Sequence, residues 1–383
     1  MRNKGTKIAG LILFIALIAG IIGYYLYTNP ISGDDDEIVD VDSLETVYVA
    51  TGGGKEDFLK DEEVVKIIQK KYGLNVVYDS WSNGKMIVND LVREDGTRYD
   101  AMFCSDERFY NYFKLPADQS KGEAKRDTVI AGSLTLNTPI VFYSWAPVVD
   151  VFINEGIVTV QDGTYYITDM DKLISYILEG KKWKDIGLND IYGTINISST
   201  DPVTSSPGTT FYGLLLSIMS GGEILDENIE QNLPNLREFY LKSGYMNNTP
   251  ADLFEGYLKT GMGAKPLIVD YEKSLVEFKN SNPKGFESIK DNIRLLYPAP
   301  TVWNSHCIAA FNEKGEKFLK VFDDEEISQI AWQKYGFRTG IAGGNFDTST
   351  LGIEGIPSSI RSVVPGLKMS SYERVVEYLK ESN

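Results

Sequence analysis

The sequence predicts an α/β fold, because short apolar runs alternate with segments that have helical periodicity. The runs at residues 47–50, 75–78 and 99–103 are typical of strands, and residues 61–72 and 85–93 between them carry apolar side chains at helical spacing. The length of 383 residues is enough for two domains with separate cores. This alternation predicts a mostly parallel sheet with helices on its faces.

The same pattern continues through the rest of the chain, without a repeat of the solenoid type. Further strands are predicted at residues 139–145, 192–198, 266–270, 293–297 and 302–311. Further helices are predicted at residues 148–155, 169–179, 210–219, 233–243, 251–260, 271–280, 314–322 and 325–335.

The N-terminal segment predicts a membrane anchor. Three basic residues precede an uninterrupted apolar run at residues 8–27, and a helix needs about 20 such residues to cross a bilayer. The basic flank predicts a cytoplasmic N-terminus, with the rest of the chain on the outer face of the membrane. A cleaved signal peptide is the alternative, but the long run and the absence of a clear cleavage site favour an uncleaved anchor. We therefore expect an anchor (or signal sequence) at residues 1–28 and an acidic flexible linker at residues 29–45.

Composition excludes several classes of function. The net charge of -16 argues against a nucleic-acid partner, which needs basic patches for phosphates. The only cysteines are Cys104 and Cys307, and the only histidine is His306, so we expect neither a Cys/His metal site nor a cofactor. A disulfide between the cysteines and two buried thiols both remain open. His306 has no partnered nucleophile, so we expect no catalytic residues and no enzyme.

Two loops after predicted strands are rich in small polar residues, and ligands of α/β sheets bind outside the carboxyl ends of strands. In the first loop, Gly52, Gly53 and Gly54 let backbone N–H groups approach a ligand, and Lys55 follows them. The second contains Ser82 and Asn83, which suit either a helix cap or a ligand contact. An ordinary turn is the alternative interpretation of the first loop.

A third loop, at residues 201–210, carries more hydroxyl groups than a helix start requires. It precedes a very apolar helix, and one hydroxyl is enough to cap the first N–H groups. The surplus predicts ligand contact by Ser205, Ser206, Gly208 and Thr209.

Several short motifs resemble one family when they are taken in their order along the chain. They are Tyr99-Asp100-Ala101, then Thr200-Asp201-Pro202 with Ser205-Ser206-Pro207-Gly208-Thr209, then Val269-Asp270-Tyr271-Glu272 and Gly336-Phe337-Arg338. Together they resemble extracellular solute-binding proteins of the type II periplasmic-binding fold, which are the receptor subunits of ABC importers. Pro207 departs from the family pattern, because proline removes one N–H donor from the start of the helix.

The resemblance implies two lobes around a central cleft. The first lobe would comprise residues 46–135 and 306–383, and the second lobe residues 136–305. Two crossovers near residues 133–139 and 299–305 would act as the hinge. A ligand that contacts both lobes would favour the closed state.

The resemblance also adds candidate site residues after the remaining strands. They are Ser105, Asp106, Asp270 and Tyr271, with Tyr143, Tyr271 and Trp303 as cleft aromatics for which core packing is the alternative. A hydroxyl-rich helix start favours an anionic ligand, whereas Asp106 and Asp270 would suit a cation or an amine. The charge of the ligand stays open.

The implied function is binding of a small polar solute on the extracytoplasmic face of the membrane, for delivery to ABC permease subunits. The alternative is an anchored sensing or adaptor domain with the same fold. A third class, an extracellular enzyme, would need a nucleophile with its base or a pair of carboxylates in the cleft.

Overall fold

The computed structural model describes residues 40–82, 85–86, 90–114, 128–222, 224, 226–340 and 345–381. The chain divides into two compact units, Met1–Ser43 and Leu44–Asn383. Residues 40–43 are the described part of the first unit, and they include a 3-10 helix, η1 (Val41–Ser43). The predicted anchor at residues 1–28 and the candidate Asn83 lie outside the described residues. Within the described ranges, none of the helices combines the length and apolarity that a membrane span requires.

The second unit begins with three parallel strands, as the sequence predicts. Strand β1 (Glu45–Thr51) lies between β2 (Leu74–Ser80) and β3 (Ala101–Cys104) and is parallel to both. Helix α3 (Glu62–Tyr72) lies between β1 and β2 in the chain. It begins after Asp61, because the Asp61 side chain accepts hydrogen bonds from the N–H groups of Glu63 and Val64. Gly73 ends the helix with a positive φ of 65°, which glycine adopts without strain. In the predicted helix at residues 85–93, Lys85 and Met86 are helical and residues 87–89 lie outside the described part.

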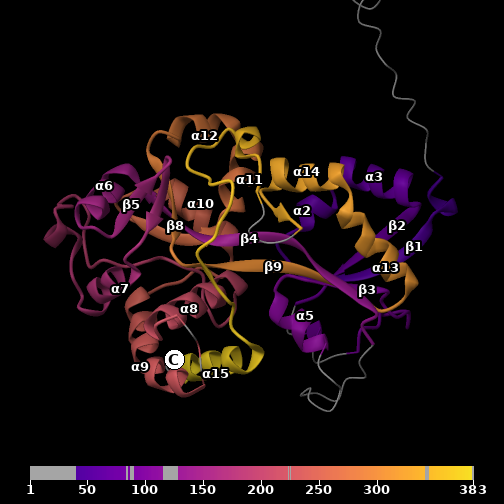
Figure 1. Cartoon of the computed structure of the whole chain (residues 1–383), viewed down its shortest axis with the longest axis horizontal. Coiled ribbons are helices and arrows are strands. Elements are labelled where there is room, and N and C mark those ends of the chain that lie inside the picture. The colour runs from indigo at the N-terminus through magenta and orange to yellow at the C-terminus, as the bar shows by residue number, and fades with distance from the viewer. Residues whose placement is uncertain are drawn as a thin grey trace, which may run out of the picture. The chain divides into compact units, whose positions relative to one another are not determined.

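Two long antiparallel strands, β4 (Ala131–Trp145) and β9 (Thr301–Ala310), cross the middle of the unit (Figure 1). They pair from Ala131 with Ala310 to Pro139 with Trp303, so the predicted crossover segments are largely strands. The prediction of a mostly parallel sheet is wrong for this reason. Each crossover continues as a strand of the sheet. Strand β4 is antiparallel to β9 and also to β7 (Leu267–Tyr271), β8 (Ile293–Pro298) and β10 (Arg338–Thr339).

The strands beyond this pair complete a mixed sheet. Its main path runs β2-β1-β3-β9-β4-β8-β6-β5, with β6 parallel to β8 and antiparallel to β5. The remaining strands are β5 (Val158–Gln161), β6 (Thr164–Ile167) and β11 (Val363–Val364).

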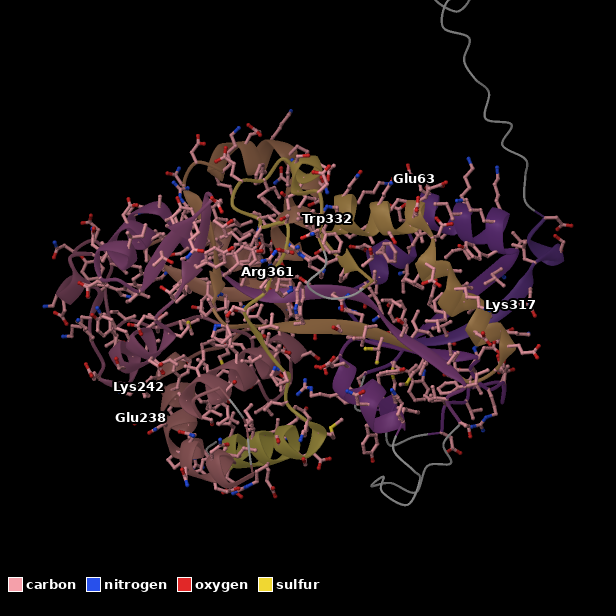
Figure 2. All side chains as sticks on the ribbon, in the orientation of Figure 1. Glu63, Glu238, Lys242, Lys317, Trp332 and Arg361 are labelled. Atoms are coloured by element: carbon pink, nitrogen blue, oxygen red, sulfur yellow. The ribbon has the colours of Figure 1, made fainter. Side chains whose placement is uncertain are left out.

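Helices cover the faces of this sheet, and most lie where helical periodicity predicts them. Besides α3, the helices of the half containing β1 are α2 (Glu56–Leu59), α5 (Glu107–Lys114), α13 (Glu313–Lys320) and α14 (Glu325–Tyr335). Those of the other half are α6 (Ala146–Asn154), α7 (Met170–Leu178), α8 (Ser206–Met219), α9 (Asp226–Ser243), α10 (Pro250–Thr260), α11 (Lys273–Ser281), α12 (Pro283–Ile289) and α15 (Met369–Lys380). Charged side chains such as Glu238 and Lys242 lie at the surface on α9 (Figure 2).

The predicted strand at residues 192–198 is not a strand. Only isolated bridges form there, such as the one between Ser198 and Ile268. Gly193 has a φ of 89°, which interrupts an extended run. Ile195 and Ile197 are buried in the core, so their apolarity reflects burial in an irregular segment.

The buried residues form separate cores in the two halves of the unit. We call the half packed around Val49, Phe103 and Phe318 the first lobe, and the half packed around Phe142 and Phe211 the second lobe. The C-terminal segment differs from its predicted assignment to the first lobe. Leu367, Val375 and Leu379 join the core of the second lobe, because the apolar face of α15 packs on α9 (Figure 1). Cys104 and Cys307 face each other in register on β3 and β9 as free, buried thiols.

Candidate ligand-binding site

A cavity of about 860 Å³ lies between residues of the first and second lobes. Its first-lobe wall comes from the loops after β1, β2 and β3, from the start of α5 and from β9. Its second-lobe wall comes from the start of α8 and from residues along α10 and α11, and Tyr372 of α15 also lines the cavity. The loops after strands thus surround the cavity, as is usual for ligand sites of α/β folds.

Most of the predicted site residues line this cavity. These are Gly53, Gly54, Ser82 and Ser105 of the first lobe, and Ser205, Ser206, Thr209 and Tyr271 of the second lobe. Asp106 and Trp303 line a neighbouring cavity of about 10 Å³, together with Thr209. Gly52, Lys55, Gly208 and Asp270 line neither of these two cavities.

The glycine loop after β1 does not present the predicted set of free backbone donors. The N–H groups of Gly54 and Lys55 both donate to Glu56 Oε2, at 2.7 and 2.9 Å. The N–H of Gly52 donates to the carbonyl oxygen of Phe103 at 2.9 Å. Helix α2, which follows the loop, has only four residues and adds little dipole. The loop therefore contributes shape to the cavity wall more than hydrogen-bond donors.

Lys55 lies behind the cavity wall instead of in the cavity. Its ammonium group donates to the Gly52 carbonyl at 2.7 Å and approaches Ser105 Oγ and His306 Nδ1, each at 3.3 Å. Burial lowers the pKa of Lys55 to about 7. Burial and the nearby Lys55 also hold the pKa of His306 well below its usual range, so the imidazole is neutral. His306 can therefore accept the Lys55 hydrogen bond.

The hydroxyl groups of the third loop divide between two roles. Helix α8 begins at Ser206, earlier than the predicted residue 210, so the loop forms its first turn. Thr209 Oγ1 is turned inward, where it donates to the Pro202 carbonyl at 2.7 Å and lies 3.0 Å from the Ser205 carbonyl. Ser205 makes no side-chain cap, and both Ser205 and Ser206 line the cavity. Of the three hydroxyl-bearing candidates in this loop, Ser205 and Ser206 keep the predicted position, whereas the hydroxyl of Thr209 is used inside the protein.

Arg108 is a cavity residue that the sequence reasoning missed. Its guanidinium donates to Asp106 through Nε at 2.9 Å and Nη2 at 2.5 Å, and the ring of Tyr372 stacks 4.4 Å away. Its Nη1 is buried and has no hydrogen-bond partner among the described residues. Its position was the available signal in the sequence, because Arg108 lies in the first turn of α5, two residues after the candidate Asp106. The pairing also means that Asp106 is not a free carboxylate for a cationic ligand.

Asn304 is a second missed residue, on β9. Its amide Nδ2 donates to the Ser105 carbonyl at 3.0 Å, while its buried Oδ1 has no partner in the part of the chain that the structure describes. Both unpartnered atoms, Asn304 Oδ1 and Arg108 Nη1, belong to residues that line the cavity from the first-lobe side. Buried polar groups of this kind are costly unless something satisfies them.

Asp270 and Tyr143 belong to the core. Burial raises the pKa of Asp270 to about 7, although its carboxylate accepts the N–H of Tyr271 at 2.8 Å. The hydroxyl of Tyr143 donates to the Tyr271 carbonyl at 2.7 Å, and its ring is fully buried. Within the described ranges, no group of three or more His, Cys, Asp or Glu side chains is placed to hold a metal ion.

The raised pKa of Asp270 predicts a pH-dependent effect of Asp270→Asn. Below about pH 4 the carboxyl is protonated in both folded and unfolded states and changes nothing. As pH rises towards 7, the unfolded carboxyl ionises while the folded one keeps its proton, so this group lowers stability. We expect D270N to remove a penalty on the order of 4 kcal/mol above pH 7, since one pKa unit is about 1.4 kcal/mol.

The measurement is the difference in Tm between D270N and the unchanged protein, from pH 4 to pH 8. That difference should grow in favour of D270N across this range. The exposed Asp150 on α6 supplies the matched Asp→Asn control. A Tm difference that stays constant with pH would contradict the raised pKa.

Solved structures share this fold. A putative extracellular solute-binding protein from Bordetella parapertussis aligns with a TM-score of 0.57 at 13% identity, covering 88% of this chain and 97% of that chain. The substrate-binding protein of an ABC transporter from Agrobacterium tumefaciens aligns with a TM-score of 0.51 at 16% identity, covering 91% of this chain and 96% of that chain. A two-component system protein described as mediating signal transduction aligns with a TM-score of 0.50 at 12% identity, covering 88% of this chain and 100% of that chain.

No protein-family model and no curated protein matches the sequence. At these low identities, the structural comparisons show a shared fold. It is the α/β fold of periplasmic binding proteins, with a mixed sheet and helices on its faces.

Proposed function

We propose that this chain binds a small polar solute on the extracytoplasmic face of the membrane and delivers it to an ABC import permease. The observation that carries the proposal is the cavity of about 860 Å³, which residues of both lobes line. Its volume lies in the range of roughly 300–1,000 Å³ that is usual for small-molecule sites. The similar solved structures include proteins named as solute-binding or substrate-binding components of ABC transporters.

The paired strands β4 and β9 suit a hinge between the lobes. Both run from one half of the sheet to the other, and their ladder joins residues 131–139 to residues 303–310. Small φ and ψ changes at the ends of such elements are enough to open and close lobes. A solute held by residues of both lobes would then favour the closed state by its differential affinity.

The first test is a thermal-shift screen of the full-length chain against oxoanions, phosphonates, polyols, amino acids and small peptides. A solute that binds only the folded state raises Tm by mass action. We expect Ser205→Ala with Ser206→Ala to abolish the shift and to leave the unliganded Tm nearly unchanged, because neither hydroxyl caps α8. Thr209→Val should instead lower the unliganded Tm, because it removes the bond to Pro202.

If no solute in the screen raises Tm, the proposed binding function loses its support. If the shift survives S205A/S206A, the start of α8 is structural and the ligand contacts lie elsewhere in the cavity. A double variant that unfolds would be replaced by the single variants, measured separately.

A sensing role on the same fold is the second candidate, and the similarity to a two-component system protein favours it. Transport predicts that the solute-loaded chain stimulates ATP hydrolysis by a reconstituted permease–ATPase complex. Sensing predicts no stimulation and a solute-dependent association with a membrane-bound partner. Both candidate functions include the apolar run at residues 8–27 as a proposed membrane anchor. A chain anchored in this way is expected to stay in the membrane fraction when membranes are washed at alkaline pH.

A further inference from the structure

We infer that the solute is an organic anion, a carboxylate or phosphate that carries an apolar group, and not a bare inorganic ion or a cation. This inference rests on the proposed binding function and names the class of its ligand. It follows from the charges that face the cavity and from the apolar side chains that line it.

The cavity offers an unused positive donor and no unused carboxylate. Among the described residues that line it, Glu277 pairs with Lys273 at 2.6 Å and Glu255 pairs with Lys259 at 2.5 Å. Arg108, by contrast, spends only Nε and Nη2 on Asp106 and keeps Nη1 unpartnered. Arg108 is only 6% exposed, so leaving this donor without a partner is costly. A cation or amine would find no free acid, whereas an anion would satisfy Nη1.

The start of α8 adds further hydrogen-bond donors to the one that Arg108 offers. The helix has 14 residues and no side-chain cap, so its first N–H groups carry the positive end of the helix dipole. Ser205 and Ser206 line the cavity there, and the Ser205 side chain makes no hydrogen bond that caps the helix. Thr209 belongs both to this turn and to the small cavity that Arg108 also lines. Arg108 and the first turn of α8 therefore lie on the same ligand space from opposite lobes.

Three large apolar side chains also line the cavity, among the polar residues of α10 and α11. They are Phe254 and Leu258 of α10 and Phe278 of α11. Phe254 is almost completely buried, and Leu258 and Phe278 pack against the same core cluster. A sulfate or phosphate ion is far smaller than about 860 Å³ and would leave these side chains without contact. An apolar group on the anion would cover them and gain the hydrophobic contribution.

The test measures dissociation constants of the full-length chain by calorimetry for four probes. They are inorganic phosphate, phenyl phosphate, phenylacetate and benzylamine. We expect at least one of phenyl phosphate and phenylacetate to bind at least about tenfold more tightly than inorganic phosphate, because the ring gains apolar contact. The better of the two shows whether the site prefers phosphate or carboxylate. Benzylamine should show no binding.

Two variants separate the apolar and the charged parts of the cavity lining. Leu258→Ser should weaken the aromatic anions several-fold and leave inorganic phosphate unchanged, whereas Leu241→Ser, an exposed leucine on α9, is the matched control and should change nothing. Asp106→Asn combined with Arg108→Gln removes both charges together, so neither partner is left as an unpaired buried charge. This double variant should weaken every anion about tenfold or more, since it removes a charge-assisted donor.

Several outcomes would overturn the inference. Benzylamine binding more tightly than both aromatic anions would show a cation site. Inorganic phosphate binding as tightly as phenyl phosphate, or no effect of L258S, would show an inorganic-ion site. If the thermal-shift screen finds a neutral or cationic solute while both aromatic anions fail, the binding function stands and the anionic class is wrong. If nothing binds at all, the proposed function itself fails.

Discussion

Replacing Glu272 with leucine is expected to lower the free energy of unfolding by roughly 3–5 kcal/mol, because it leaves a buried arginine without its counter-ion. The Arg338 guanidinium donates to Glu272 through Nε at 2.7 Å and Nη2 at 2.9 Å, and both side chains are completely buried. The hydroxyl of Tyr297 donates to the same carboxylate at 2.5 Å. Arg338 also donates to the carbonyls of Pro357 and Ser358.

This ion pair ties three distant parts of the chain together. Glu272 follows β7 in the second lobe, Arg338 follows α14, and the two carbonyls belong to the C-terminal segment. The guanidinium also lies over the rings of Trp332, labelled in Figure 2, and Phe346, at 5.0 and 5.2 Å. Loss of the Glu272 carboxylate should therefore leave the Arg338 charge unpaired. It should also weaken the attachment of the segment around Pro357 and Ser358.

Chemical denaturation of the variants measures this effect. The matched control is Glu230→Leu, which removes a bidentate partner of Arg374 with similar distances of 2.6 and 2.9 Å at an exposed site. Exposed pairs contribute about 0–1 kcal/mol. The larger cost of E272L therefore reflects the burial of its pair together with the lost hydrogen bond from Tyr297. The double variant E272L with Arg338→Met should be less destabilised than E272L alone, because no unpaired charge remains. A cost below about 1 kcal/mol for E272L would contradict the role of the pair.

Gly208→Ala is expected to cost about 1–3 kcal/mol of stability and to weaken solute binding. A Cβ at residue 208 would lie 2.3 Å from the Thr200 carbonyl oxygen and 2.8 Å from the nitrogen of Pro202. These are backbone atoms that cannot turn aside, so the first turn of α8 has to move away from residues 200–202. Ser205 and Ser206 in that turn would shift with it.

Denaturation and the thermal shift with the best solute of the screen measure the two effects of G208A. Gly263→Ala is the matched control, because a Cβ there meets nothing within 4 Å and its φ is not positive. The glycine is thus explained by close packing and not by direct ligand contact. An unchanged Tm for G208A would show that the segment at residues 200–202 yields easily, and would remove this explanation.

The sequence predicted the elements well wherever periodicity was strong. The strands β1, β2, β3, β7, β8 and β9 and the helices α3, α7, α10 and α14 lie close to their predicted ranges. The strand predicted at residues 192–198 was wrong, because an apolar run with Ile195 and Ile197 signals burial and not backbone geometry. The predicted range of α8 was too short, because its polar first turn looks like a loop when only side-chain chemistry is considered.

The candidate site was predicted at the level of loops and less well at the level of atoms. Ser205 and Ser206 line the cavity as expected, whereas Thr209 turns its hydroxyl into the protein. The donors of the glycine loop are occupied by Glu56, a local contact that no sequence pattern announces. Arg108 was missed because it is a candidate only through its unpartnered Nη1 atom. Tertiary packing decides which hydrogen-bond partners a side chain has, and the sequence does not show them.

The sequence by itself determined the alternating α/β elements and the polar loops at strand ends, because period and turn chemistry are local properties of neighbouring residues. Tertiary structure alone decided that β4 and β9 pair antiparallel across the sheet, and that α15 packs on the second lobe. It also decided which polar atoms of the cavity lining lack a partner among the described residues, such as Arg108 Nη1. Those outcomes depend on contacts between residues far apart in the chain, such as Arg338 with Glu272, and only the folded packing selects among the alternatives.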